Sequence, residues 1–102
     1  MLVLDRGHFD HMTGADRTLQ IEVLGLFRAQ VEGWSAAMAS AVGWREAVHT
    51  LKGSARGIGL AALAAACEAA ETAEDSESAL AEVRIALGQA LDALEQFAAE
   101  AA

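Results

Sequence analysis

The sequence predicts an all-α protein, namely an antiparallel, up-down four-helix bundle with a short additional helix at its N-terminus. The composition favours helices, because alanine is abundant and none of the 102 residues is proline, the residue that breaks helix interiors. Apolar residues also recur at three- and four-residue intervals, which places them on one face of a helix. Since 54% of the residues are hydrophobic, the chain can bury a core, and its length fits a single domain over residues 1–102.

The first predicted helical segment is short and precedes a long one. Residues 5–12 read DRGHFDHM and can form one or two helical turns before a break at Thr13-Gly14. Either Asp16 or Thr13 then serves as the N-cap of a long helix, because short polar side chains accept hydrogen bonds from free amide groups at a helix start. The apolar face that we expect this helix to bury comprises Leu19, Val23, Leu26, Phe27, Val31, Trp34 and Met38.

A short connection is expected within residues 39–43, where either Ser40 caps the next helix or Gly43 marks the turn. The third predicted helix begins near Trp44. Its apolar positions are Ala47, Val48, Leu51, Ala55 and Ile58. Gly59 is expected to end this helix, because glycine readily adopts the left-handed conformation found just beyond a helix C-terminus.

Two further helices complete the predicted bundle. The apolar positions of the fourth helix are Leu60, Leu63, Ala64, Cys67 and Ala70. Residues 74–78, EDSES, form a turn in which Asp75 or Ser76 can cap the last helix. The apolar positions of that helix are Leu80, Val83, Leu87, Leu91, Leu94 and Phe97. Because all the connections are short, consecutive helices are expected to be antiparallel neighbours.

The charge of the chain excludes several classes of partner. Its net charge is −8 with only seven Lys and Arg residues, whereas nucleic acids and anionic membranes are held by many basic side chains. No apolar run approaches the roughly 20 residues that span a bilayer, and the N-terminus lacks the features of a signal peptide. The single Cys67 cannot form an internal disulfide. We therefore expect a cytoplasmic protein that binds neither nucleic acid nor membrane. We also expect a monomer, because one bundle can bury its own core.

Residues 49–59, HTLKGSARGIG, have an unusual composition. They contain Lys52, the only lysine in the chain, and three of its nine glycines, although glycine weakens a helix interior by about 1 kcal/mol relative to alanine. Residues three and four apart share a helix face, so this segment and its flank place one stripe of residues opposite the apolar face. This His49 stripe comprises Arg45, His49, Lys52, Gly53 and Arg56. The sequence thus predicts an outward-facing histidine in a cationic patch on an acidic protein.

The residue types in the His49 stripe suit the transfer of an anionic group. Cationic side chains donate charge-assisted hydrogen bonds to phosphoryl oxygens, and Gly53 leaves room beside the imidazole for another macromolecule. An imidazole is largely neutral near neutral pH and is then a competent nucleophile. The alternative is a solvated helix face, on which exposed His, Lys and Arg have no partner and glycine only permits close helix packing.

Taken together, these residues resemble the signature of the histidine-containing phosphotransfer domain, the HPt domain of two-component phosphorelays. The signature runs approximately H-x-L-K-G-S-[SA]-x-x-[LIV]-G. The residues that match it are His49, Leu51, Lys52, Gly53, Ser54, Ala55, Ile58 and Gly59. A TG-x-D stretch before the long helix, here Thr13, Gly14 and Asp16, and the leucine- and alanine-rich helices after the motif extend a weaker resemblance over the whole chain. One departure is the short segment between the long helix and the histidine.

The resemblance implies a role for each matched position. His49 would accept the phosphoryl group, and Lys52 would hold its oxygens or stabilise the charge as it moves. Gly53 would give clearance for a receiver domain, and Ser54 would bond the imidazole or shape the helix. The bundle core would include Trp44, Val48, Leu51 and Ile58.

The implied function is a phosphocarrier that relays a phosphoryl group between aspartates of receiver domains. The partners would be response regulators or the receiver of a hybrid histidine kinase. They would dock on the neighbouring long helix and on the residues of the stripe and its flank, namely Arg45, Gly53, Ser54 and Arg56. No Gly-rich ATP loop is present in the sequence, so we expect no autokinase activity. We also expect no cofactor in this chain, because Mg²⁺ would belong to the receiver.

The sequence also admits other functions. A helical bundle that docks receivers or kinases without carrying phosphate is the alternative, and it would not need both His49 and Lys52. A metal site at His8 and His11 is disfavoured, because structural zinc usually takes four ligands. We expect these histidines to lie on the surface or to pack the first helix over the bundle.

Two further features of the sequence carry no predicted chemistry. Cys67 lies on the apolar face of its helix, so we expect a buried structural thiol rather than a redox centre. The acidic residues after it are expected to form a solvated helix face and turn. They are Glu68, Glu71, Glu74 and Asp75.

Overall fold

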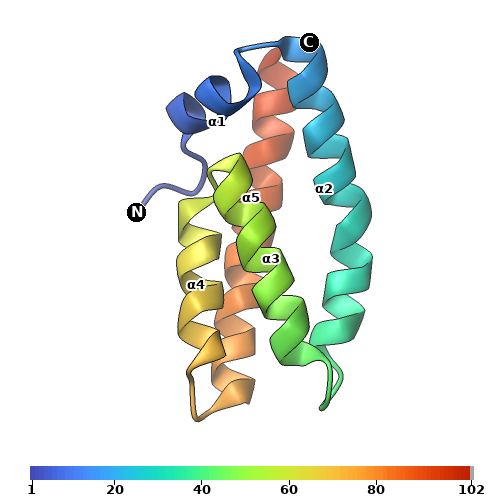
Figure 1. Cartoon of the computed structure of the whole chain (residues 1–102), viewed down its shortest axis with the longest axis vertical. Helices are drawn as coiled ribbons and strands as arrows, with labels where there is room; N and C mark the ends of the chain where they lie inside the picture. The colour runs from blue at the N-terminus through green and yellow to red at the C-terminus, as the bar shows by residue number, and fades with distance from the viewer. Residues whose placement is uncertain (102) are drawn as a thin grey trace.

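Five α-helices account for most of residues 1–101, the part of the chain that the computed structural model describes (Figure 1). The helices are α1 (Arg6–Thr13), α2 (Arg17–Met38), α3 (Trp44–Ile58), α4 (Ala61–Glu71) and α5 (Ser76–Ala101). This arrangement confirms the predicted all-α class, with the short first helix and the connection within residues 39–43. None of the helices in residues 1–101 is long and apolar enough to cross a bilayer.

The four longer helices form a ring in which each one packs against its neighbours in the chain. α2 packs on α3, α3 on α4 and α4 on α5, and α5 closes the ring against α2. Figure 1 shows α3 in front of α5, with α2 and α4 on either side and α1 at the end of α3. Because consecutive helices are antiparallel, the N-terminus of α3 lies beside the C-terminus of α4.

The local signals at the helix ends act as the sequence predicts. Asp16 caps α2 by accepting a hydrogen bond from the Leu19 amide at 3.2 Å, and Asp75 accepts one from the Ser78 amide at the start of α5 at 3.2 Å. Gly59 ends α3 with a φ of 98°. A Cβ at Gly59 would lie 2.9 Å from the Asp5 carbonyl oxygen, so only glycine fits this turn.

The connection before α3 uses both of its predicted signals. Gly43 is the N-cap residue of α3 and forms no side-chain capping bond. Ser40 lies earlier in the turn, where its Oγ accepts hydrogen bonds from the amides of Val42 at 3.3 Å and Gly43 at 3.2 Å. The hydroxyl therefore stabilises the turn rather than the helix start itself.

Helix α1 packs across the C-terminal end of α3. The Asp5 amide donates to the Gly59 carbonyl at 2.8 Å, and the His8 Nε2 atom lies 3.3 Å from the Gly57 carbonyl oxygen. These contacts supply partners to carbonyl groups that have none within the helix. His8 is thus an exposed residue that also helps to seat α1, which combines the two roles expected for it.

The core is apolar and centred between the four longer helices. Val48, Leu51 and Ala55 of α3 are completely buried, and Ile58 is 5% exposed. The core also contains two pairs of aromatic rings in contact. The ring centroids are 5.4 Å apart for Phe9 and Phe97 and 5.2 Å apart for Phe27 and Trp34. Trp44 is only half-buried and packs against the edge of this cluster.

The predicted core face of α2 is partly wrong. Leu19 and Leu26 are 41% and 65% exposed, whereas Leu24 is 7% exposed and Gln20 is 1% exposed. α2 carries two adjacent apolar stripes one residue apart. The rotation of the helix buries the stripe that contains Leu24 and Phe27, and with it the polar Gln20. The other stripe faces outward beside α3.

The buried Gln20 side chain has all of its hydrogen-bonding groups engaged. Its Nε2 donates to Asp10 Oδ1 at 2.7 Å and to Thr13 Oγ1 at 3.0 Å, and its Oε1 accepts from Arg17 at 3.1 Å. A buried amide is tolerated only with such partners. This network joins α1 to α2. It also allows a polar side chain to occupy a buried position of α2, where an apolar one would otherwise be expected.

Candidate functional site

His49 lies near the middle of α3 on its outward face, as the helical spacing predicts. Its side chain is 71% exposed, while Val48 and Leu51 on the opposite face are completely buried. The burial of that apolar face fixes the rotation of α3, and with it the direction in which the imidazole points.

Lys52 lies one turn after His49, but its side chain does not extend into solvent. It is only 13% exposed, and its Nζ atom lies 2.7 Å from Glu71 Oε1. The same carboxylate oxygen lies 3.4 Å from His49 Nδ1. Glu71 is the last residue of α4, so the antiparallel packing of α3 and α4 creates a His49–Lys52–Glu71 cluster.

The electrostatics of this cluster keep the carboxylate ionised. The hydrogen bond from Lys52 lowers the pKa of Glu71 below its ordinary value; partial desolvation opposes this effect, and the hydrogen bond from His49 adds to the lowering. Glu71 is therefore a charged acceptor between the imidazole and the ammonium group at neutral pH.

Cys67 lies one turn before Glu71 on α4 and is completely buried. Burial raises the pKa of its thiol to about 11. Because the thiolate is the reactive form of cysteine, this residue is the structural thiol that the sequence predicts.

The acidic residues of α4 and of the turn after it follow the sequence interpretation except at Glu71. Glu68, Glu74 and Asp75 are exposed as expected, although Glu68 Oε2 also lies 3.2 Å from Arg56. Glu71 is only 25% exposed, because it pairs with His49 and Lys52 of the His49 stripe. Periodicity within one helix cannot show what a neighbouring helix presents. The available signal was the turn at residues 59–60, because His49 lies ten residues before Gly59 and Glu71 lies eleven after Leu60, which places them side by side in an antiparallel pair.

Arg45, which is expected to dock a partner, is exposed and also makes contacts within the domain. Its guanidinium lies 4.3 Å from the centroid of the Trp44 ring and donates a hydrogen bond of 2.5 Å to the backbone carbonyl of Glu71. The side chain is thus turned across the α3–α4 contact.

Gly53 and Ser54 lie on the other side of the imidazole. Gly53 is exposed, and apart from its two chain neighbours and the adjacent helix backbone no atom of the described residues lies within 4 Å of the position that its Cβ would take. Packing within the described chain therefore does not require this glycine. Ser54 faces α2, and the hydrogen bonds found within residues 1–100 do not join it to His49.

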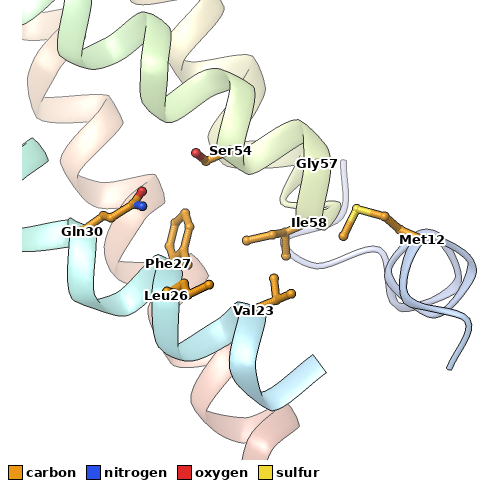
Figure 2. Close-up of a pocket in the computed structure, with 8 residues that line it drawn as sticks. All are labelled: Met12, Val23, Leu26, Phe27, Gln30, Ser54, Gly57 and Ile58. Atoms are coloured by element: carbon orange, nitrogen blue, oxygen red, sulfur yellow. The ribbon is translucent and has the colours of Figure 1, made fainter. Parts of the chain in front are cut away.

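An apolar groove of about 230 Å³ lies between α2 and α3, beside the His49 stripe (Figure 2). It is lined by Met12 of α1, by Val23, Leu26, Phe27 and Gln30 of α2, and by Ser54, Gly57 and Ile58 of α3. Figure 2 shows the α2 side chains facing α3, with Met12 at one end of the groove. The groove contains the outward apolar stripe of α2, so the sequence interpretation missed it by assigning Leu26 to the core.

The family of the chain is established by comparison with known proteins. A model of the Hpt domain matches residues 22–97, about three quarters of the chain. The chain belongs to the Hpt domain family. The matched range contains α3, α4 and the whole His49–Lys52–Glu71 cluster. No curated protein and no solved structure matches the chain.

This Hpt domain is thereby a histidine phosphotransfer component of a phosphorelay, as its family implies. Helix α1, and with it Met12 in the groove, lies outside the residues that the family model matches.

The contact with Glu71 also bears on the tautomer of the His49 imidazole. The bond made by one ring nitrogen sets the tautomer and so determines which nitrogen keeps its lone pair. A neutral His49 that donates from Nδ1 to the ionised Glu71 presents its lone pair at Nε2. In that tautomer the partner of Nδ1 is a residue that lies 22 positions later in the chain.

Proposed function

We propose that this Hpt domain relays a phosphoryl group through His49 between the aspartates of receiver domains. These receivers would belong to two response regulators, or to a hybrid histidine kinase and a response regulator. The observation that carries the proposal is an exposed imidazole, 71% accessible, whose Nδ1 faces an ionised carboxylate. The Hpt family match supports the same reading.

The proposed step is an in-line displacement at phosphorus. Nε2 of His49 attacks the phosphorus of an aspartyl phosphate; the new P–N bond forms as the P–O bond breaks, and the aspartate leaves as a carboxylate. The proton stays on Nδ1, and Glu71 stabilises the positive charge that develops on the ring. The reverse step returns the phosphoryl group to a second aspartate.

Lys52 can assist this step without losing its present contact. An ammonium group has three donors, so Nζ can keep its 2.7 Å bond to Glu71 while it donates to an incoming phosphoryl oxygen. The bond to Glu71 holds the side chain beside the imidazole before the partner arrives. Such preorganised charge is the main means by which proteins assist phosphoryl transfer.

Docking is proposed to use the surface from Gly53 to the α2–α3 groove. Leu26 and Met12 are 65% and 44% exposed there, and an apolar groove of this kind suits the apolar face of a partner helix. Gly53 would let that partner approach the imidazole. Arg56, which is exposed at the α4 side of the stripe, would contribute a rim contact.

We further propose that residues 1–102 act as one Hpt unit, a phosphocarrier without autokinase activity. The cluster supplies a nucleophile and two charged neighbours, and ATP-binding residues were not identified in the sequence. Under this proposal the phosphate always arrives from another protein.

The test is a transfer assay with a phosphorylated receiver carrying a radioactive label. We expect the wild-type chain to acquire an acid-labile label and His49→Gln to acquire none. Equal labelling of His49→Gln and wild type would refute the proposal. Binding of the receiver by both proteins without labelling of either would instead support the docking adaptor.

A further inference from the structure

Arg45 occupies a position that is unfavourable within its own helix. It is the second residue of α3, and a cation at a helix N-terminus is repelled by the positive end of the helix dipole. The side chain lies across the Trp44 ring at 4.3 Å and reaches the Glu71 carbonyl. It therefore lies at the negative end of the neighbouring antiparallel helix, where a cation is stabilising.

The C-terminus of α4 needs such a partner. The last turn of α4 contains no basic residue, and its two acidic residues, Glu68 and Glu71, are repelled by the negative end of the dipole. The carbonyl groups of the last turn of a helix accept no hydrogen bonds from amides of the same helix. Arg45 supplies the missing charge and one of the missing donors.

Glu71 is also the residue that connects this helix end to the reactive centre. Its side chain bridges His49 Nδ1 at 3.4 Å and Lys52 Nζ at 2.7 Å, while its backbone carbonyl accepts from Arg45. Movement of the last turn of α4 would displace the carboxylate from both partners, because Glu71 is its final residue.

We propose that Arg45 is a positioning residue that acts on His49 through Glu71. By holding the C-terminal carbonyl of α4 against α3, it fixes the carboxylate that selects the Nδ1–H tautomer of the imidazole and anchors Lys52. This inference rests on the proposed function of His49, and it gives the exposed Arg45 side chain a role within the domain.

The test compares Arg45→Met with Arg56→Met. Methionine at position 45 keeps an apolar stem over Trp44 and removes the hydrogen-bond donor and the charge. Arg56→Met removes an equal charge from the same stripe, but Arg56 pairs with Glu68 rather than with Glu71. Nitrogen NMR of the His49 ring reports the tautomer in the free protein. Labelled transfer from a phosphorylated receiver reports function, and circular dichroism confirms that each variant is folded.

We expect Arg45→Met to lose the preference for the Nδ1–H tautomer and to transfer phosphate about tenfold more slowly, the effect of one lost charge-assisted hydrogen bond. Arg45→Lys, which keeps a cationic donor, is expected to restore most of both. Arg56→Met is expected to keep the wild-type tautomer.

A wild-type tautomer in Arg45→Met would overturn the inference, whatever the transfer rate. In particular, equal slowing by the two methionine variants with unchanged ring spectra would show that Arg45 acts only through the charge of the docking surface. If the wild-type chain accepted no phosphate, the proposed function would fail, but the ring spectra would still decide whether Arg45 positions Glu71.

Discussion

Replacement of Gly53 by alanine separates the effect of this glycine on the fold from its effect on the partner. Gly53 lies within α3, is exposed, and has no atom beyond the adjacent helix backbone within 4 Å of the Cβ position. Alanine should therefore stabilise the helix by about 0.5–1 kcal/mol. For a domain of this size, we expect the midpoint of thermal unfolding to rise by about 4 °C.

The same methyl group is expected to slow phosphotransfer. It projects about 1.5 Å from Cα, one turn from His49 and on the outward face. A displacement of about 1 Å between reacting groups can cost a hundredfold in rate, so we expect transfer from a phosphorylated receiver to fall at least tenfold. The assay is the initial rate of label transfer, measured beside thermal unfolding by circular dichroism.

Gly88 provides a matched control for Gly53. It lies within α5, is also exposed, and has no such neighbour within 4 Å of its Cβ position. Gly88→Ala should give the same gain in stability with an unchanged transfer rate. The reasoning would be refuted by a Gly53→Ala protein that is more stable and still transfers at the wild-type rate, since the glycine would then give no clearance.

Three further predictions follow from the packing and the charges. Lys52→Ala should raise the pKa of Glu71 toward its ordinary value, which carbon NMR of the carboxyl group can follow. Because folding lowers that pKa, the wild-type protein should lose stability as the pH falls through the folded-state pKa. The variant should lose less stability over the same pH range. A carboxyl titration unchanged by the substitution would contradict the assigned hydrogen bond. Leu24→Ala should cost about 2–5 kcal/mol in unfolding free energy, whereas Leu26→Ala, at a 65% exposed site, should change it by less than about 0.5 kcal/mol; comparable losses in urea denaturation would mean that α2 is rotated differently. Leu26→Glu should weaken receiver binding in calorimetric titration, while Ile85→Glu on α5, which is 57% exposed, should not, and equal weakening would place the docking surface elsewhere.

Local chemistry explains why the helix boundaries could be predicted. The cap at Asp16, the left-handed Gly59 and the turn at Asp75 depend on contacts within a few residues, so the sequence contains the information that specifies them. The outward direction of His49 follows in the same way, because α3 has a single strongly apolar face and the rest of the helix must face solvent.

The sequence did not determine the rotation of α2. Leu19 and Leu26 belong to one apolar stripe, and Leu24 belongs to the next. Both stripes have helical periodicity, and only the packing of α1, α3 and α5 around α2 decides which one is buried. The stripe left outside became a wall of the groove, and the polar Gln20 was buried because Asp10, Thr13 and Arg17 supply its partners.

By itself, the sequence determined that the chain is helical, where the helices end, and that His49 and Lys52 lie one turn apart on the side of α3 opposite its apolar face. Only the tertiary structure decided that Glu71 lies between them and that Arg45 reaches the end of α4. The physical reason is the range of the interactions. Periodicity and capping act within one helix, whereas the pairing of charges across α3 and α4 depends on how two helices are aligned by the burial of their apolar faces.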